Sequence, residues 1–228
     1  MFQPLMAQEY QNDNLKIELK YSPMNLAGDN GISADLACFK AGVEARVYRG
    51  MKIGVGYQGA SGGGGTFLGR SNSNVDYSNI DAYVKLPMNL ASLSNSYNTS
   101  SPTPAENDFF FTLGYKWHAL NSSGSPLNQG RTWENGNGVG VGIGYDGYFE
   151  GVGLYVLGAY YPSMNANSVP NAVAGASYTF KDYVYKAGLK FKLRENIGIL
   201  VGYEGETHEY SNGTLRYSGA VGGLEFRF

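Results

Sequence analysis

Hydrophobic and polar residues alternate with a period of two in ten segments of the chain. In residues 39–47, for example, Phe, Ala, Val, Ala and Val alternate with Lys, Gly, Glu and Arg. Successive side chains of a β-strand point to opposite faces, so each such segment would be a strand with one apolar and one polar face. The predicted strands are residues 15–21, 39–47, 52–58, 80–86, 108–118, 138–145, 151–161, 182–193, 197–208 and 215–228. The pattern predicts an all-β chain.

Small residues indicate which face points inward. Gly138, Gly140, Gly142 and Gly144 fall on the face that carries charges in the other strands. A water-exposed face has no need of small residues, whereas the inside of a narrow barrel needs room for long side chains that cross it. A soluble barrel of the lipocalin kind would place its apolar face inside. We therefore expect the apolar residues to face lipid, in a transmembrane antiparallel up-and-down β-barrel.

Segment 151–161 is apolar at both parities, so its orientation is not fixed by alternation. We assign Val152, Leu154 and Val156 to the outside, because Gly151, Gly153 and Tyr155 suit an interior.

The connections also alternate in length. Short turns are expected at residues 49–51, 146–148 and 194–196, and longer segments rich in Gly, Ser, Asn and Pro at residues 25–38, 61–74, 119–136 and 162–177. This is typical of periplasmic turns and extracellular loops. The stretch 89–107 is an exception, because it is long but falls on the periplasmic side. It leaves eight strands as the alternative to ten, and ten places both ends of the barrel domain on the periplasmic side.

Length and composition bound the domain organisation and exclude some partners. With 228 residues, the chain is expected to form one barrel domain over residues 15–228, preceded by an N-terminal segment, residues 1–14, in which Leu-Met-Ala at 5–7 resembles the remnant of a signal-peptide cleavage site. The 33 glycines and 19 tyrosines, with only 16% charged residues, favour short strands and aromatic belts. A net charge of −2 without basic clusters argues against nucleic-acid binding.

The last predicted strand places Leu224, Phe226 and Phe228 on one face. This pattern resembles the C-terminal signature of Gram-negative outer-membrane β-barrels, which the membrane-insertion machinery reads. The chain resembles a small outer-membrane barrel of the porin-like superfamily, of the YfaZ type. The resemblance implies a bacterial outer-membrane location, contact with the lipid bilayer and lipopolysaccharide, recognition by the insertion machinery, and no cofactor.

Charged residues on the polar face are candidate lumen residues. They are Lys40, Glu44, Arg46, Lys52, Asp81, Lys85, Lys116, Lys186, Lys190, Glu204 and Glu206. Charges in a narrow lumen must be paired or hydrated. They would form either an ion-pair network that fills the barrel or a narrow water-filled path with a mild preference for anions.

Catalytic and metal-binding motifs are sparse. Glu206 and His208 share one face of a predicted strand, which resembles the acidic residue two positions before the histidine in omptin proteases. Omptins carry Asp at that position and a second acidic pair, which has no clear counterpart here. His118 is the only other histidine, and its strand has no known approach to His208. We therefore predict neither a metal site nor an enzyme, with Glu206 and His208 as catalytic candidates only in the omptin alternative.

These observations predict a structural outer-membrane barrel or a narrow channel for ions and small solutes. The first alternative is an adhesin-like barrel that binds through Tyr- and Asn-rich loops. The second is the omptin-like protease.

Overall fold

The computed structural model describes most of the barrel domain. The described residues are 14–29, 32–48, 50–67, 70–88, 108–123, 131–149, 151–168, 176–211 and 213–228. Residues 1–13 of the predicted N-terminal segment and the unusually long connection 89–107 lie outside this set. No helix in the described part is long and apolar enough to cross a membrane.

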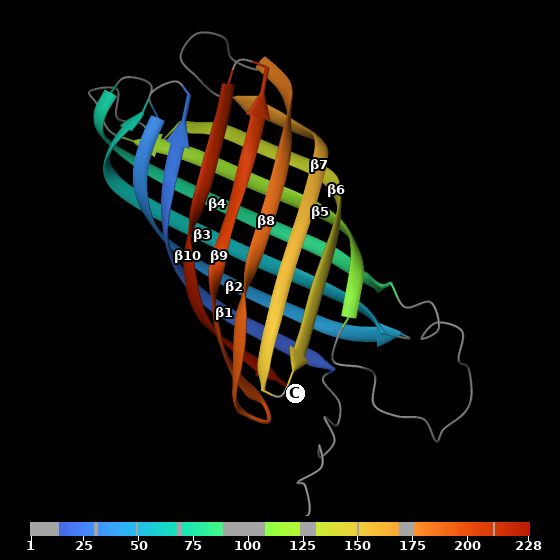
Figure 1. Ribbon diagram of the computed structural model, residues 1–228. Helices are drawn as coiled ribbons and strands as arrows, with labels where there is room; N and C mark the ends of the chain where they lie inside the picture. The colour runs from blue at the N-terminus through green and yellow to red at the C-terminus, as the bar shows by residue number, and fades with distance from the viewer. Residues whose placement is uncertain are drawn as a thin grey trace, which may run out of the picture.

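Ten strands form one closed antiparallel barrel (Figure 1). Their bounds are β1 Leu15–Gly28, β2 Ile32–Tyr48, β3 Met51–Phe67, β4 Arg70–Pro87, β5 Asp108–Ser123, β6 Arg131–Phe149, β7 Val152–Ser168, β8 Ala176–Arg194, β9 Ile197–Tyr210 and β10 Gly213–Arg227. Every strand pairs with its neighbours in sequence, and β1 pairs with β10 from Lys16↔Arg227 to Gly28↔Leu215. The prediction of ten strands is confirmed, and the eight-strand alternative is wrong.

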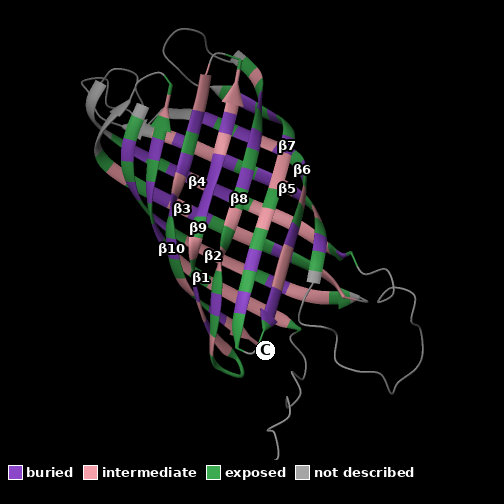
Figure 2. Ribbon diagram, in the orientation of Figure 1, coloured by how far each residue is buried: buried purple, intermediate pink, exposed green. Residues whose placement is uncertain are grey.

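The outside of the barrel carries an apolar belt. Large hydrophobic side chains of all ten strands are exposed there, among them Leu19, Val43, Val55, Ile80, Leu113, Ile143, Leu154, Leu189, Val201 and Leu224. Figure 2 shows buried and exposed positions alternating along the strands. In β7, Val152, Leu154 and Val156 are exposed whereas Tyr155 is buried, which confirms the predicted orientation. A closed sheet that is apolar outside and charged inside suits a lipid bilayer.

The strands continue beyond the belt at one end of the barrel. We call the end at which β1 begins and β10 ends the lower end, and the opposite one the upper end (Figure 1). Strands contain 14 to 19 residues, whereas a bilayer-spanning strand needs only about 9 to 11. Much of the predicted loops 25–38, 61–74, 119–136 and 162–177 is therefore strand. That prediction was wrong in extent, because the polarity of the two faces reverses at this end.

The reversal of polarity is clear in β1 and β2. Met24, Leu26 and Leu36 point inward and are buried, whereas Asn25 and Asp35 are exposed and hydrogen-bond to each other across the outer face. The inward residues form an apolar cluster that we call the apolar cap. It contains Met24, Leu26, Ala34, Leu36, Cys38, Ala60, Val75, Tyr77, Leu120, Leu215 and Tyr217. At the upper end the barrel thus has a water-facing exterior and an apolar interior, as a soluble barrel does.

Inward glycines allow aromatic rings to lie against the barrel wall. A Cβ atom on Gly140 would clash with the Tyr161 ring, and one on Gly188 would clash with the Tyr155 ring and the backbone oxygen of Val201. Neither contact is tolerable, so a larger residue would displace the ring. The glycine-rich face does mark the inside, and inward tyrosines occupy much of the room it leaves.

The belt predicts how the barrel responds to a charge on its outer face. Replacing Ile143, which is exposed in the middle of the belt on β6, by Arg should lower the free energy of unfolding from lipid vesicles by about 2 to 4 kcal/mol, because the guanidinium would lie in hydrocarbon. Asn135→Arg is the matched control, since Asn135 is exposed on the same face of β6 but beyond the belt. It should change stability by no more than about 0.5 kcal/mol. Equal losses in denaturant titrations of the two variants would contradict a lipid-facing belt.

Candidate functional site

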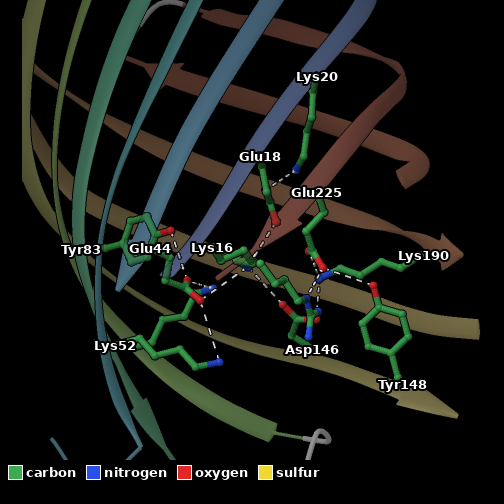
Figure 3. A network of polar contacts seen from close by, with 12 residues as sticks. Lys16, Glu18, Lys20, Glu44, Lys52, Tyr83, Asp146, Tyr148, Lys190 and Glu225 are labelled. Carbon is green, nitrogen blue, oxygen red and sulfur yellow. Dashed lines mark hydrogen bonds and ion pairs between the residues drawn. The ribbon is translucent and has the colours of Figure 1, made fainter. Parts of the chain in front are cut away.

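An ion-pair network fills the lower part of the lumen (Figure 3). We call it the lower network; its charged members are Lys16, Glu18, Glu44, Lys52, Lys85, Asp146, Lys190, Glu225 and Arg227. They come from β1, β2, β3, β4, β6, β8 and β10, so the network spans the lumen between strands that are not neighbours in the sheet.

Lys190 and Lys16 are the two centres of the lower network. Lys190 Nζ lies 2.6 Å from Asp146 Oδ1 and 2.9 Å from Glu225 Oε2. Lys16 Nζ lies 3.1 Å from Glu18 and 3.4 Å from Glu44. Because the Lys190 side chain is only 1% exposed, its charge depends on these carboxylates rather than on water.

A second set of contacts links the lower network to the middle of the barrel. Glu204 on β9 accepts hydrogen bonds from Lys20 Nζ at 2.9 Å and from Lys40 Nζ at 2.8 Å. Lys20 also lies 3.0 Å from Glu18. Buried Glu204 is thus held by two ammonium groups from β1 and β2.

Above this link lies a buried cluster that includes both histidines of the chain. We call it the histidine cluster; it contains Tyr77, Asn79, Lys116, His118, Glu134, Tyr178, Asp182, Glu206, His208 and Tyr210. In one half of it, Lys116 Nζ lies 2.7 Å from Asp182 Oδ2 and 3.1 Å from Glu206 Oε2. Glu206 also accepts hydrogen bonds from Tyr77 and Asn79, at 2.7 and 3.0 Å.

The other half of the histidine cluster surrounds Glu134. His118 Nε2 lies 2.6 Å from Glu134 Oε1. Tyr210 donates to the same oxygen at 2.8 Å, and Tyr178 donates to Oε2 at 2.7 Å. The rings of His118 and His208 are stacked with centroids 4.8 Å apart, and Phe180 packs against both. Tyr77 belongs to the apolar cap as well as to this cluster, and Tyr217 of the cap packs against His208 with ring centroids 5.2 Å apart, so the cap adjoins the cluster directly.

A cavity of about 150 Å³ remains in the lumen. Its wall includes Lys16, Glu18 and Lys85 of the lower network, the Lys20, Lys40 and Glu204 link, and also Asp81 and Lys186. The wall also includes Phe110, Tyr155 and Tyr161, so charged groups and aromatic rings line the space together.

The structure places the predicted lumen residues on the inward faces of their strands. The lower network contains Glu44, Lys52, Lys85 and Lys190, and the link contains Lys40 and Glu204. The histidine cluster contains Lys116 and Glu206, and the cavity wall contains Asp81 and Lys186. Arg46 shares the inner face of β2 with Glu44. Leu224 and Phe228 are 41% and 61% exposed at the lower end, and Phe226 is half-buried.

Three important residues escaped the sequence analysis. Glu134 fell in a predicted loop, Asp146 in a predicted turn, and Tyr210 beyond the end of its predicted strand. A usable signal existed for the first two, because both share the even parity of Gly138 to Gly144 and so continue the inner face of β6. Extending the alternation beyond the apolar belt would have found them.

The omptin alternative gains little from this geometry. His208 Nε2 does lie near Glu206, at 3.6 Å from Oε2. Both side chains are buried among the described residues, so neither presents a surface to a peptide bond. Tyr77 and Asn79 of β4 donate hydrogen bonds to Glu206, so neutral groups occupy both of its oxygens.

The lower network predicts a large difference between buried and exposed ion pairs. Lys190→Met leaves Asp146 and Glu225 without their closest ammonium group, so it should lower the free energy of unfolding by about 3 to 5 kcal/mol. Lys181→Met removes the exposed pair with Glu209, whose side chains are 47% and 42% exposed, and should cost at most about 1 kcal/mol. Denaturant titration of both variants is the measurement. Equal costs would show that water screens Lys190.

Comparison with known proteins bears on the fold. No family model and no curated protein matches the chain, so the YfaZ-type resemblance stays a prediction. Among solved structures, the outer membrane protease OmpT from Escherichia coli matches with a TM-score of 0.60 at 10% identity, covering 98% of this chain and 99% of that one. The transport unit of the autotransporter AIDA-I from Escherichia coli matches with a TM-score of 0.50 at 11% identity, covering 98% and 93%. Such low identities carry the fold and not an activity. The chain therefore shares the closed β-barrel fold of these two outer-membrane proteins, and it carries an apolar belt on its outside.

Proposed function

We propose that the protein is a closed structural barrel of the outer membrane rather than an open channel. One observation carries the proposal: lysines such as Lys190 and Lys116 pair with carboxylates across the lumen, and the apolar cap occupies the upper end. A pore for ions would need hydrated charges along a continuous path.

Electrostatics support a filled lumen. The anion preference expected from lumen lysines depends on ammonium groups that can attract a passing ion. Lys190 and Lys116, however, each lie within 3.1 Å of two carboxylates. An anion would have to displace those carboxylates from buried cations, which costs several kcal/mol per broken pair. The paired lysines therefore link strands across the lumen.

Size supports the same conclusion. The cavity of about 150 Å³ is smaller than the pockets of about 300 to 1,000 Å³ that hold small molecules. Barrels with eight strands are filled by their side chains, and wide channels occur at about 16 strands. A ten-stranded barrel with inward tyrosines lies close to the filled limit.

The adhesin alternative loses part of its basis, because strands occupy much of the sequence that was expected to form long binding loops. In the described part of the chain, the segments beyond the belt are paired strands with several register shifts.

Planar-bilayer recording tests the proposal. The reconstituted protein should give no discrete conductance steps, because the apolar cap and the paired charges block a water path. Lys186→Glu, which inverts a charge in the cavity wall, should be equally silent.

Steady single-channel steps in the wild type whose ion selectivity shifts in Lys186→Glu would contradict the closed barrel and favour the narrow channel. Circular dichroism of the same reconstituted samples is the control, because silence is informative only when the barrel is folded.

A further inference from the structure

The two histidines of the chain meet inside the barrel. His118 lies on β5 and His208 on β9, strands that do not pair in the sheet. Their rings are nevertheless parallel to within 11° with centroids 4.8 Å apart, and both side chains are buried. The cluster around them is explained neither by the closed barrel nor by the omptin alternative.

The charge of the histidine cluster requires compensation. With neutral imidazoles, Lys116 contributes one positive charge, and Glu134, Asp182 and Glu206 contribute three negative charges, which leaves a net charge of −2. Among the described residues, only the two histidines provide a cationic group within ion-pair distance of Glu134. An uncompensated carboxylate is costly where its side chain is fully buried, as that of Glu134 is. One divalent cation would neutralise the cluster.

The donor atoms are arranged for such an ion. His118, Glu134 and His208 can each offer one ligand atom, and these atoms lie within 4.8 Å of one another. We propose that these three residues bind one divalent transition-metal ion of the zinc class. Two imidazole nitrogens and one carboxylate oxygen are typical zinc ligands, and imidazole selects against the hard cations Ca²⁺ and Mg²⁺.

Tyr210 lies at the fourth position of the site. Its hydroxyl is 2.8 Å from Glu134 Oε1 and 3.3 Å from His208 Nδ1. Two ligands of a tetrahedral zinc ion lie about 3.3 Å apart, given metal–ligand distances of about 2.0 to 2.2 Å. His118 Nε2 and Glu134 Oε1, now 2.6 Å apart, need to separate by less than about 1 Å, which side-chain rotation can supply.

The surrounding groups would orient the ligands. Tyr178 holds Glu134 Oε2 at 2.7 Å, so Oε1 remains turned toward the histidines. His208 Nε2 has no hydrogen-bond partner, and it lies 3.7 Å from Asp182 Oδ1, which also has none, and 3.6 Å from Glu206 Oε2. If Nδ1 binds the ion, the proton is on Nε2 and faces those two carboxylates. A carboxylate behind a metal-bound histidine is a common support of zinc sites.

The ion would join strands that the sheet leaves apart. β5 and β6 are neighbours, but β9 is separated from β6 by β7 and β8 in the order of the barrel. A bound ion would therefore link β5 and β6 to β9 across the lumen, next to the apolar cap.

Metal titration of the folded full-length chain tests the site. The protein carries no affinity tag, is refolded in detergent micelles and is freed of metal with a chelator. Co²⁺ should bind with one ion per barrel and give the visible absorption of a tetrahedral site, and Zn²⁺ should displace it. Zn²⁺ should also raise the midpoint of thermal unfolding, since it binds only the folded barrel.

Variants identify the ligands. His118→Gln, His208→Gln and Glu134→Gln should each weaken Zn²⁺ binding by about 100-fold or more, because loss of even a supporting group costs about 10- to 100-fold. Glu209→Gln is the matched control. Glu209 follows His208 on β9 but contacts Lys181 and Tyr183 at the exposed surface, so its affinity should equal that of the wild type.

Two results would overturn the proposal. The first is that the wild type, with its fold verified by circular dichroism, shows no saturable binding of Co²⁺ or Zn²⁺ at micromolar concentration. The other is wild-type affinity in Glu134→Gln or in either histidine variant. Because a variant can misfold, X-ray absorption of the Zn²⁺-loaded wild type gives an independent test: two imidazole nitrogens support the site, and an all-oxygen shell refutes it.

Discussion

Compensation of charge in a space too narrow for bulk water is the constraint on which this barrel depends. Its outer face lies in lipid at the height of the belt and must be apolar there, so ionised groups at that height point inward. There, each one needs a partner from another strand. The contacts of Lys190 with Asp146 and Glu225, and of Glu204 with Lys20 and Lys40, meet this need. They also fix the distance across the lumen, so the same pairs that neutralise the interior hold its walls together.

The interior changes character along the axis because the surroundings of the barrel change. Within the belt, lipid outside is matched by ion pairs inside. Above it, water outside is matched by the apolar cap inside, with Asn25 and Asp35 on the outer face and Leu26 and Leu36 on the inner one. The histidine cluster lies at the transition, covered by Tyr217 and Phe180. This position explains how polar groups there can be both numerous and shielded from water.

The sequence was informative where one face meets lipid. Alternation predicted the ten strands, the outward set Val152, Leu154 and Val156, and the inward charges, because a spanning strand allows few exceptions to its pattern. The alternation failed at the upper end. It was interpreted with apolar residues outside, and the segment around Glu134 has its polar residues outside, so this segment was not predicted as a strand. The meeting of His118 and His208 was not predictable, because β5 and β9 do not pair and their approach depends on the diameter and tilt of the barrel.

The register of the seam between β1 and β10 has a consequence for how the chain reaches its native state. Glu225 lies on β10, and it contacts Lys190 of β8 and Arg227 while accepting a hydrogen bond from Tyr148 of β6. Lys16 of β1 lies opposite Arg227 in the seam and forms ion pairs with Glu18, Glu44 and Asp146. β1 therefore belongs to the same lower network. Without β10, Lys190 would lack one of its two carboxylate partners, Glu225. The strand that closes the ring against β1 thus also completes the ion pairs of Lys190, so closure of the barrel and neutralisation of its interior depend on the same segment.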